Sequence, residues 1–111
     1  MITFAPNVQI VDFTEQLALI FRLAGNWANI SNVSVEINSI DDKRHKVGTL
    51  HGWSLAIDLD TAGDKMPDLE QLHGYLARHL PHPYQVLLEQ DHVHVEWDMQ
   101  RKKTPLAPRI A

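Results

Sequence analysis

The chain of 111 residues contains no cysteine, so it can form neither a disulfide nor a thiolate metal site. Any metal ion has to be held by histidine and carboxylate side chains. The chain also lacks a run of about 18 apolar residues that could span a membrane, and its first 25 residues lack the basic start and cleavage site of a secretory signal. We therefore expect synthesis in the cytoplasm and no membrane span.

Basic side chains are also in the minority. Ten lysines and arginines stand against fourteen acidic residues, and the resulting net charge of −4 argues against a general nucleic acid binder. The content of 44% hydrophobic and 22% charged residues is typical of a globular protein. We expect one monomeric domain over residues 1–111, with a core from about 13 to 98 and a tail from 99 to 111. No Gly-rich phosphate loop or G-x-S-x-G motif is present.

Two stretches carry the residues that are best suited to metal chemistry. His51 and Asp58 lie seven residues apart, and a His-x-His pair preceded by aspartate follows at 91 to 94. A catalytic zinc typically has three protein ligands and one position left open for water. His51, Asp58 and His94 can supply these three ligands.

Strand periodicity favours the same grouping. If residues 54 to 60 and 92 to 97 form strands, Asp58 and His94 each fall on the polar face of their strand, opposite the apolar residues. The two side chains can then share one face of a sheet. His51 is an odd number of residues from Asp58, so it has to lie in the preceding turn, which two nearby glycines favour.

These residues resemble a known family. Its pattern S/T-x-H-x-x-G-x-A-x-D, followed later by D/E-H-x-H or D/E-x-x-H, belongs to the zinc D-Ala-D-Ala carboxypeptidases and phage endolysin peptidases, relatives of the lysostaphin and hedgehog domains. Ser54 stands where the family usually has glycine, and the resemblance covers about residues 13 to 98. The positions that match are Thr49, His51, Ala56 and Asp58 in the first motif and Asp91, His92 and His94 in the second.

The resemblance implies a zinc-dependent peptidase that hydrolyses peptide bonds of bacterial cell-wall peptidoglycan, of the D-Ala-D-Ala carboxypeptidase or L-Ala-D-Glu endopeptidase type. One Zn²⁺ per chain would be held by His51, Asp58 and His94. Asp91 would act as the general base, and His92 would contact the developing oxyanion or position the substrate. Such an enzyme, from a phage or prophage, would act at the cell wall after release or be carried by a phage particle.

The substrate contacts are less clearly marked. Arg44 is the candidate for the family's arginine that holds the substrate carboxylate, although no matching strand end precedes it, and a solvated charged loop over 41 to 46 is the alternative. Thr49 belongs to the first motif, and Trp53 either lines a substrate groove or packs in the interior. The competing interpretation of the whole chain is a non-catalytic binding or structural module, such as a phage particle component, that keeps the fold and the metal.

The remaining pattern predicts an α+β fold, an antiparallel sheet of about four strands with two helices on one face and the zinc site on the other. After a loose lead-in with at most a short extended piece, we expect a helix at about 14 to 24 closed by Gly25, a turn-rich segment at 26 to 32 and a strand at 33 to 38. The strand with Asp58 follows, and then a helix that begins at Pro67 and ends before Pro81. The last expected element is a hairpin of Tyr84 to Leu88 with 92 to 97, which has Asp91 in its turn.

Other conspicuous side chains have simpler interpretations. Trp27 and Trp97 are expected to pack in the interior, and His73 is expected to be a core histidine at the edge of its helix's apolar stripe. Glu96 shares the face of His94 and is interpreted as an exposed strand residue, with a role as partner of the site as the alternative. The histidines expected at the surface are His45, His79 and His82.

Overall fold

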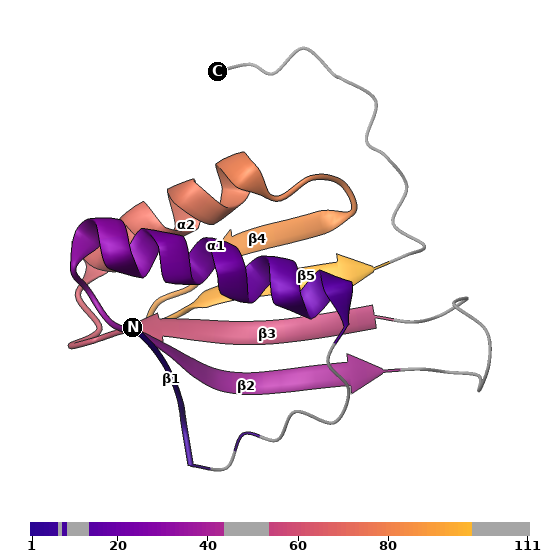
Figure 1. Cartoon of the computed structure of the whole chain (residues 1–111), viewed down its shortest axis with the longest axis horizontal. Coiled ribbons are helices and arrows are strands. Elements are labelled where there is room, and N and C mark those ends of the chain that lie inside the picture. Colours follow the sequence, from indigo (N-terminus) through magenta and orange to yellow (C-terminus); the bar gives the residue numbers. More distant parts are fainter. Residues whose placement is uncertain (7, 9–13, 44–53, 99–111) are drawn as a thin grey trace.

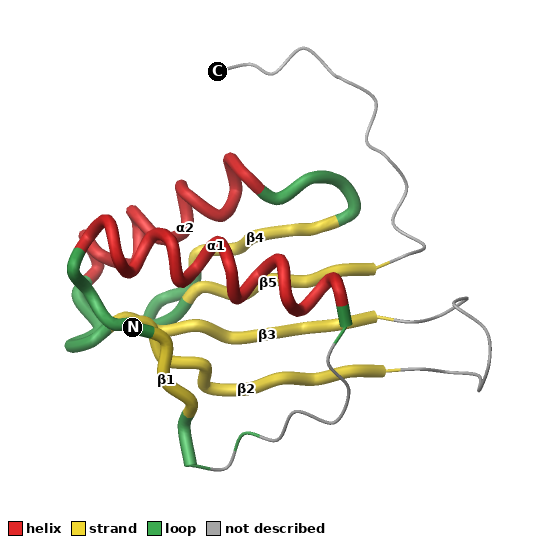
Figure 2. Tube along the Cα trace, in the orientation of Figure 1, coloured by secondary structure: helices red, strands yellow, loops and turns green. Residues whose placement is uncertain are grey.

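The computed structural model describes residues 1–6, 8, 14–43 and 54–98, with two helices and five strands in two layers (Figure 1). Both helices lie on the same face of the sheet, as the trace in Figure 2 also shows. No helix within these ranges is long and apolar enough to cross a membrane. The elements are β1 (Ile2–Phe4), α1 (Glu15–Ser31), β2 (Val35–Lys43), β3 (Ser54–Thr61), α2 (Met66–His79), β4 (Tyr84–Leu88) and β5 (Val93–Asp98).

The sheet has the order β1-β2-β3-β5-β4 and is mixed. β1 runs parallel to β2, whereas the other neighbouring strands are antiparallel. The predicted α+β class with two helices on one face is confirmed, but the purely antiparallel sheet of four strands is wrong because β1 adds a fifth. That strand has only three residues, too few to show a clear alternation of apolar and polar side chains.

Helix α1 is longer than its sequence pattern suggested. It begins after Thr14, whose Oγ1 accepts a hydrogen bond from the Leu17 amide as predicted for an N-cap, but it passes through Gly25 and ends at Asn32. Burial explains the extra turns, because Trp27 is only 4% exposed and continues the apolar stripe. Asn32 adopts the left-handed conformation (φ 56°) that closes the helix. The turn-rich segment predicted at 26 to 32 is therefore wrong.

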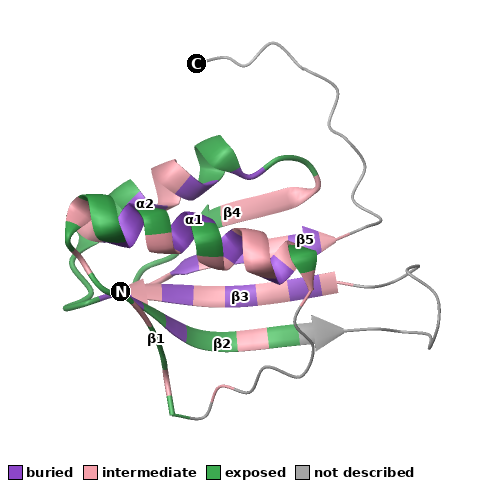
Figure 3. Ribbon diagram, viewed as in Figure 1, coloured by how far each residue is buried: buried purple, intermediate pink, exposed green. Residues whose placement is uncertain are grey.

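The strands next to the candidate site alternate as predicted. Along β3 the side chains of Leu55, Ile57 and Leu59 are buried, and the residues between them are partly exposed (Figure 3). The same alternation holds along β5. Because successive side chains point to opposite faces, one face of these strands packs against the helices and the other, which we call the open face, remains accessible.

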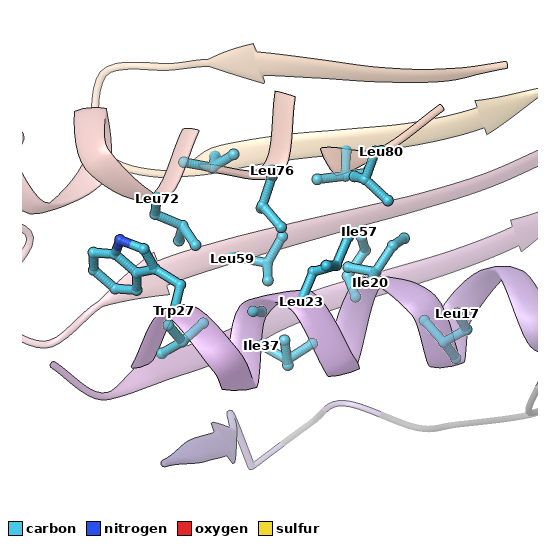
Figure 4. Packing of buried hydrophobic residues seen from close by; sticks show 14 of the residues in the cluster. Leu17, Ile20, Leu23, Trp27, Ile37, Ile57, Leu59, Leu72, Leu76 and Leu80 are labelled. Atoms are coloured by element: carbon cyan, nitrogen blue, oxygen red, sulfur yellow. The ribbon is translucent and has the colours of Figure 1, made fainter. Parts of the chain in front are cut away.

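The core fills the space between the helices and the sheet. Leucines of α2, such as Leu72 and Leu76, meet Ile20 and Leu23 of α1 above Ile57 of β3 (Figure 4). Trp27 and Trp97 both belong to this cluster, as predicted. Close packing on this side fixes the position of β3 and β5, and hence of the side chains on their open face.

The second half of the chain follows the prediction closely. α2 has Pro67 in its first turn and ends before Pro81, and β4 and β5 form the expected hairpin. His73 is only partly buried, with its Nε2 3.2 Å from the carbonyl oxygen of Val86. The charged segment predicted as a loop at 41 to 46 begins differently, since its first three residues pair with β3 as the end of β2.

Candidate metal centre

Asp58 and His94 face each other across the pairing of β3 with β5. The register places them directly opposite, and His94 Nδ1 lies 2.6 Å from Asp58 Oδ1. Because both strands are held by the core below, this contact depends on the sheet rather than on flexible loops. The predicted sharing of one face by these two residues is confirmed.

His92 precedes β5 by one residue and lies close to Asp58 and His94. Its Nε2 is 3.6 Å from Asp58 Oδ1, and one ligand atom from each of Asp58, His92 and His94 falls within 4.8 Å of the others. The three side chains are 30%, 28% and 22% exposed, respectively. They form a group that could bind a metal and that a ligand can reach from the open face.

The spacing of the donor atoms can be compared with that of a zinc ion. Zinc–ligand distances of about 2.0 to 2.2 Å in tetrahedral geometry put neighbouring ligand atoms roughly 3.3 Å apart. The 3.6 Å between His92 and Asp58 is close to this value. The 2.6 Å between His94 and Asp58 is a hydrogen bond, so it has to widen by about 0.7 Å when a metal replaces the proton. A small side-chain rotation gives this change, and Asp58, His92 and His94 could together hold a metal ion.

Asp91 orients His92. Its Oδ1 lies 2.6 Å from His92 Nδ1, and the Glu89 amide donates to the His92 carbonyl oxygen across the hairpin turn. A carboxylate accepts but does not donate when ionised, so the proton of a neutral His92 is held at Nδ1. Nε2 is then the ring nitrogen that faces Asp58. The predicted place of Asp91 in the hairpin turn is confirmed.

Asp58 is held from its other side by β2. The Ser39 hydroxyl donates to Asp58 Oδ2 at 3.0 Å. This contact depends on an irregularity in β2, where the pairing with β3 shifts by one residue between Ile37 and Ser39. Such a bulge changes which side chains face the neighbouring strand. Sequence reasoning missed Ser39, because no local signal in the sequence marks this shift.

Glu96 is a direct partner of the site, contrary to its interpretation as a merely exposed strand residue. Its Oε1 lies 2.9 Å from His94 Nε2. Partial burial lowers the pKa of His94, but the hydrogen bonds to Asp58 and Glu96 and their negative charges outweigh this, and the pKa is raised above its usual 6.5. In the absence of a metal, a protonated imidazole with two N–H groups matches the two carboxylates.

A cavity of about 300 Å³ adjoins these residues. His94 and Glu96 contribute to its wall, together with Ala56 of β3 and Trp97 and Asp98 of β5. The cavity gives a second molecule room to lie directly beside the imidazole of His94. A second molecule can therefore reach His94 from this cavity.

Acyl transfer by a serine is not supported by these contacts. Ser39 donates to the carboxylate of Asp58 and not to an imidazole, whereas an activated serine needs a base such as histidine next to its hydroxyl. Ser39 lies next to the aspartate and not next to the histidine, so its hydroxyl orients the Asp58 carboxylate. The contacts of Asp58, His92 and His94 are those of a possible metal site.

Four of the residues predicted for the site lie outside the described ranges. They are the proposed ligand His51 and the substrate-binding candidates Arg44, Thr49 and Trp53. The two motifs nevertheless meet in space through Asp58 of the first and His92 and His94 of the second. Comparison of the chain with family models, with curated proteins and with solved structures found no significant match.

Proposed function

We propose that the protein is a zinc-dependent peptidase that hydrolyses peptide bonds of bacterial cell-wall peptidoglycan, of the D-Ala-D-Ala carboxypeptidase or L-Ala-D-Glu endopeptidase type. The observation that carries the proposal is the meeting of Asp58 with His92 and His94 on the open face. These residues come from two motifs 33 or more positions apart, and the same two motifs support the resemblance to this peptidase family. Lytic action in a phage or prophage setting belongs to the same proposal.

In this proposal His51, Asp58 and His94 hold the metal, and His92 stays beside it. A bound Zn²⁺ supplies Lewis acidity, which polarises the scissile carbonyl and lowers the pKa of water to about 7. Asp58 contributes a carboxylate that Ser39 already orients. The Asp91 carboxylate is 76% exposed at the turn and contacts His92 Nδ1, so it has to rotate toward the metal side of His92 to accept the proton of the attacking water. His92 Nε2 faces the same space, and His92 helps to position the substrate or, when Nε2 carries a proton, donates a hydrogen bond to the substrate oxygen on which negative charge develops.

The cavity beside His94 gives the peptide its place. Its wall contains His94 and Glu96 and extends along β5 to Asp98. A peptide lying there brings its carbonyl close to the imidazole of His94, whereas the opposite face of the sheet is filled by the core. The open face is thus the side from which the substrate approaches.

Hydrolysis of purified cell walls tests the proposal. The zinc-loaded protein should clear a wall suspension and release peptide fragments, and chelation should stop both. Asp91→Asn should keep its zinc and lose essentially all hydrolysis. His92→Ala should keep its zinc and lose about 100- to 1000-fold, the usual effect of removing one oxyanion contact.

A matched control and two outcomes complete this test. Glu89→Gln removes a charge from the same turn without touching His92 Nδ1 and should stay active. Full activity of Asp91→Asn with an inactive His92→Ala would assign the base to His92, which Asp91 contacts at 2.6 Å. Protein that sediments with walls and never cleaves them would instead identify a binding module and refute the peptidase.

A further inference from the structure

Glu96 lies on the far side of His94 from the candidate metal. It is two residues further along β5 and on the same face. Its Oε1 contacts His94 Nε2 at 2.9 Å, while Nδ1 of the same ring contacts Asp58 at 2.6 Å. The imidazole thus lies between two carboxylates, only one of which belongs to the group of potential ligands.

This arrangement selects one form of the imidazole. A neutral histidine has one N–H group and one lone pair, and a metal ion takes the lone pair. Both carboxylates accept from the ring, so a metal ion that replaces the proton at Nδ1, beside Asp58, leaves the proton at Nε2 held by Glu96. The lone pair is then at Nδ1, which is the nitrogen that faces Asp58.

The same geometry keeps Glu96 away from the ion itself. A metal bound to Nδ1 lies about 2.0 to 2.1 Å from that atom, on the opposite side of the ring from Glu96 Oε1. The distance between the ion and Oε1 is then about 7 Å, which is too long for coordination. Glu96 can act on the ion only through His94.

We propose that Glu96 is a positioning residue that makes His94 a metal ligand through Nδ1, by holding the ring proton at Nε2 and fixing the plane of the ring. This inference rests on the metal centre of the proposed function, but it requires no particular substrate. Carboxylates that orient ligand histidines typically change metal affinity by 10- to 100-fold when they are removed.

Zinc titration against a competing chelator tests the role of Glu96. Glu96→Ala should weaken zinc binding by 10- to 100-fold. Glu96→Gln should stay within a few-fold of the parent protein, because its amide oxygen still accepts from Nε2–H. Glu36→Gln is the matched control, since Glu36 is an exposed carboxylate of the same face in β2, and it should bind zinc as the parent does.

The ¹⁵N spectrum of the histidine rings supplies a readout that a merely structural role would not change. In the zinc-loaded parent, His94 should show a protonated Nε2 and a metal-bound Nδ1. A metal-bound Nε2, zinc affinity of Glu96→Ala within twofold of the parent, or no zinc binding by the parent would each overturn the inference. A protein that binds zinc in this way but cleaves no walls would refute the peptidase and leave the inference intact.

Discussion

The strongest prediction concerns the coupling between zinc and folding. The ligands Asp58 and His94 and their neighbour His92 come together only in the folded sheet, so zinc should bind the folded chain in preference to the unfolded one. At a free zinc concentration of 100 times the dissociation constant, the free energy of unfolding should rise by about 2.7 kcal/mol. Adding chelator should remove this gain.

The size of the melting shift follows from the length of the chain. An unfolding entropy of about 2.1 cal/mol/K per residue gives roughly 0.23 kcal/mol/K for 111 residues. A gain of 2.7 kcal/mol then corresponds to a rise in Tm of about 12 °C. This is an upper value, because the seven histidines of the unfolded chain also bind zinc.

Thermal unfolding followed by circular dichroism, with zinc and with chelator, measures this shift. Asp58→Asn should abolish most of it, because Asp58 contacts both His92 and His94. Glu70→Gln removes the same charge from an exposed position of α2 and should keep the full shift. Equal shifts in the two variants, or an unchanged Tm in a parent protein shown by elemental analysis to gain and lose zinc, would refute the coupling.

Two further predictions concern stability alone. Burial, followed by a hydrogen bond with the Asp64 carboxyl, raises the pKa of Asp60 from 3.8 to about 6. Protonated Asp60 therefore stabilises the folded protein fully below pH 3.8, and this contribution is lost as the pH rises through about 6. At pH 7 the free energy of unfolding of Asp60→Asn, measured with urea, should therefore exceed that of the parent by about 1 kcal/mol after allowing for solvent screening. At pH 4 the two proteins should be equally stable, and the same difference at both pH values would contradict this. Two glycines lie within helices, Gly74 in open space and Gly25 where an added carbon meets Ile2 at an ordinary 3.5 Å. Gly74→Ala and Gly25→Ala should each raise the free energy of unfolding by about 0.5 to 1 kcal/mol in the same assay. A decrease in Gly25→Ala would show that α1 and β1 are packed too tightly there.

The strands of the candidate site could be predicted because their alternation is strict. In β3, apolar residues at 55, 57 and 59 leave Asp58 on the opposite face, and a shift by one residue would bury it. The hairpin register then brings His94 opposite Asp58. The helix that follows β3 was equally clear, since Pro67 and Pro81 mark its two ends.

The features that escaped prediction depend on tertiary contacts. Gly25 is a good helix terminator in isolation, but burial of Trp27 against the core outweighs the cost of a glycine within α1. Ser39 reaches Asp58 only because of the bulge in β2. Strand alternation predicts that Glu96 shares the face of His94, but residue spacing does not reveal the hydrogen bond between the two side chains.

Asp58 is supported differently from His92, and this difference bears on how the centre works. Ser39 of β2 and His94 of β5 hold the two carboxylate oxygens of Asp58 from the strands on either side, and all three strands rest on the core. His92 instead precedes β5 at the hairpin turn, where its ring is held by the exposed Asp91. The sheet thus fixes the ligands Asp58 and His94, whereas the hairpin turn holds Asp91 and His92 beside them. Because Asp91 and His92 are not ligands in the proposed function, their side chains can act on the water and the substrate, and we assign proton transfer to Asp91 and the oxyanion contact to His92.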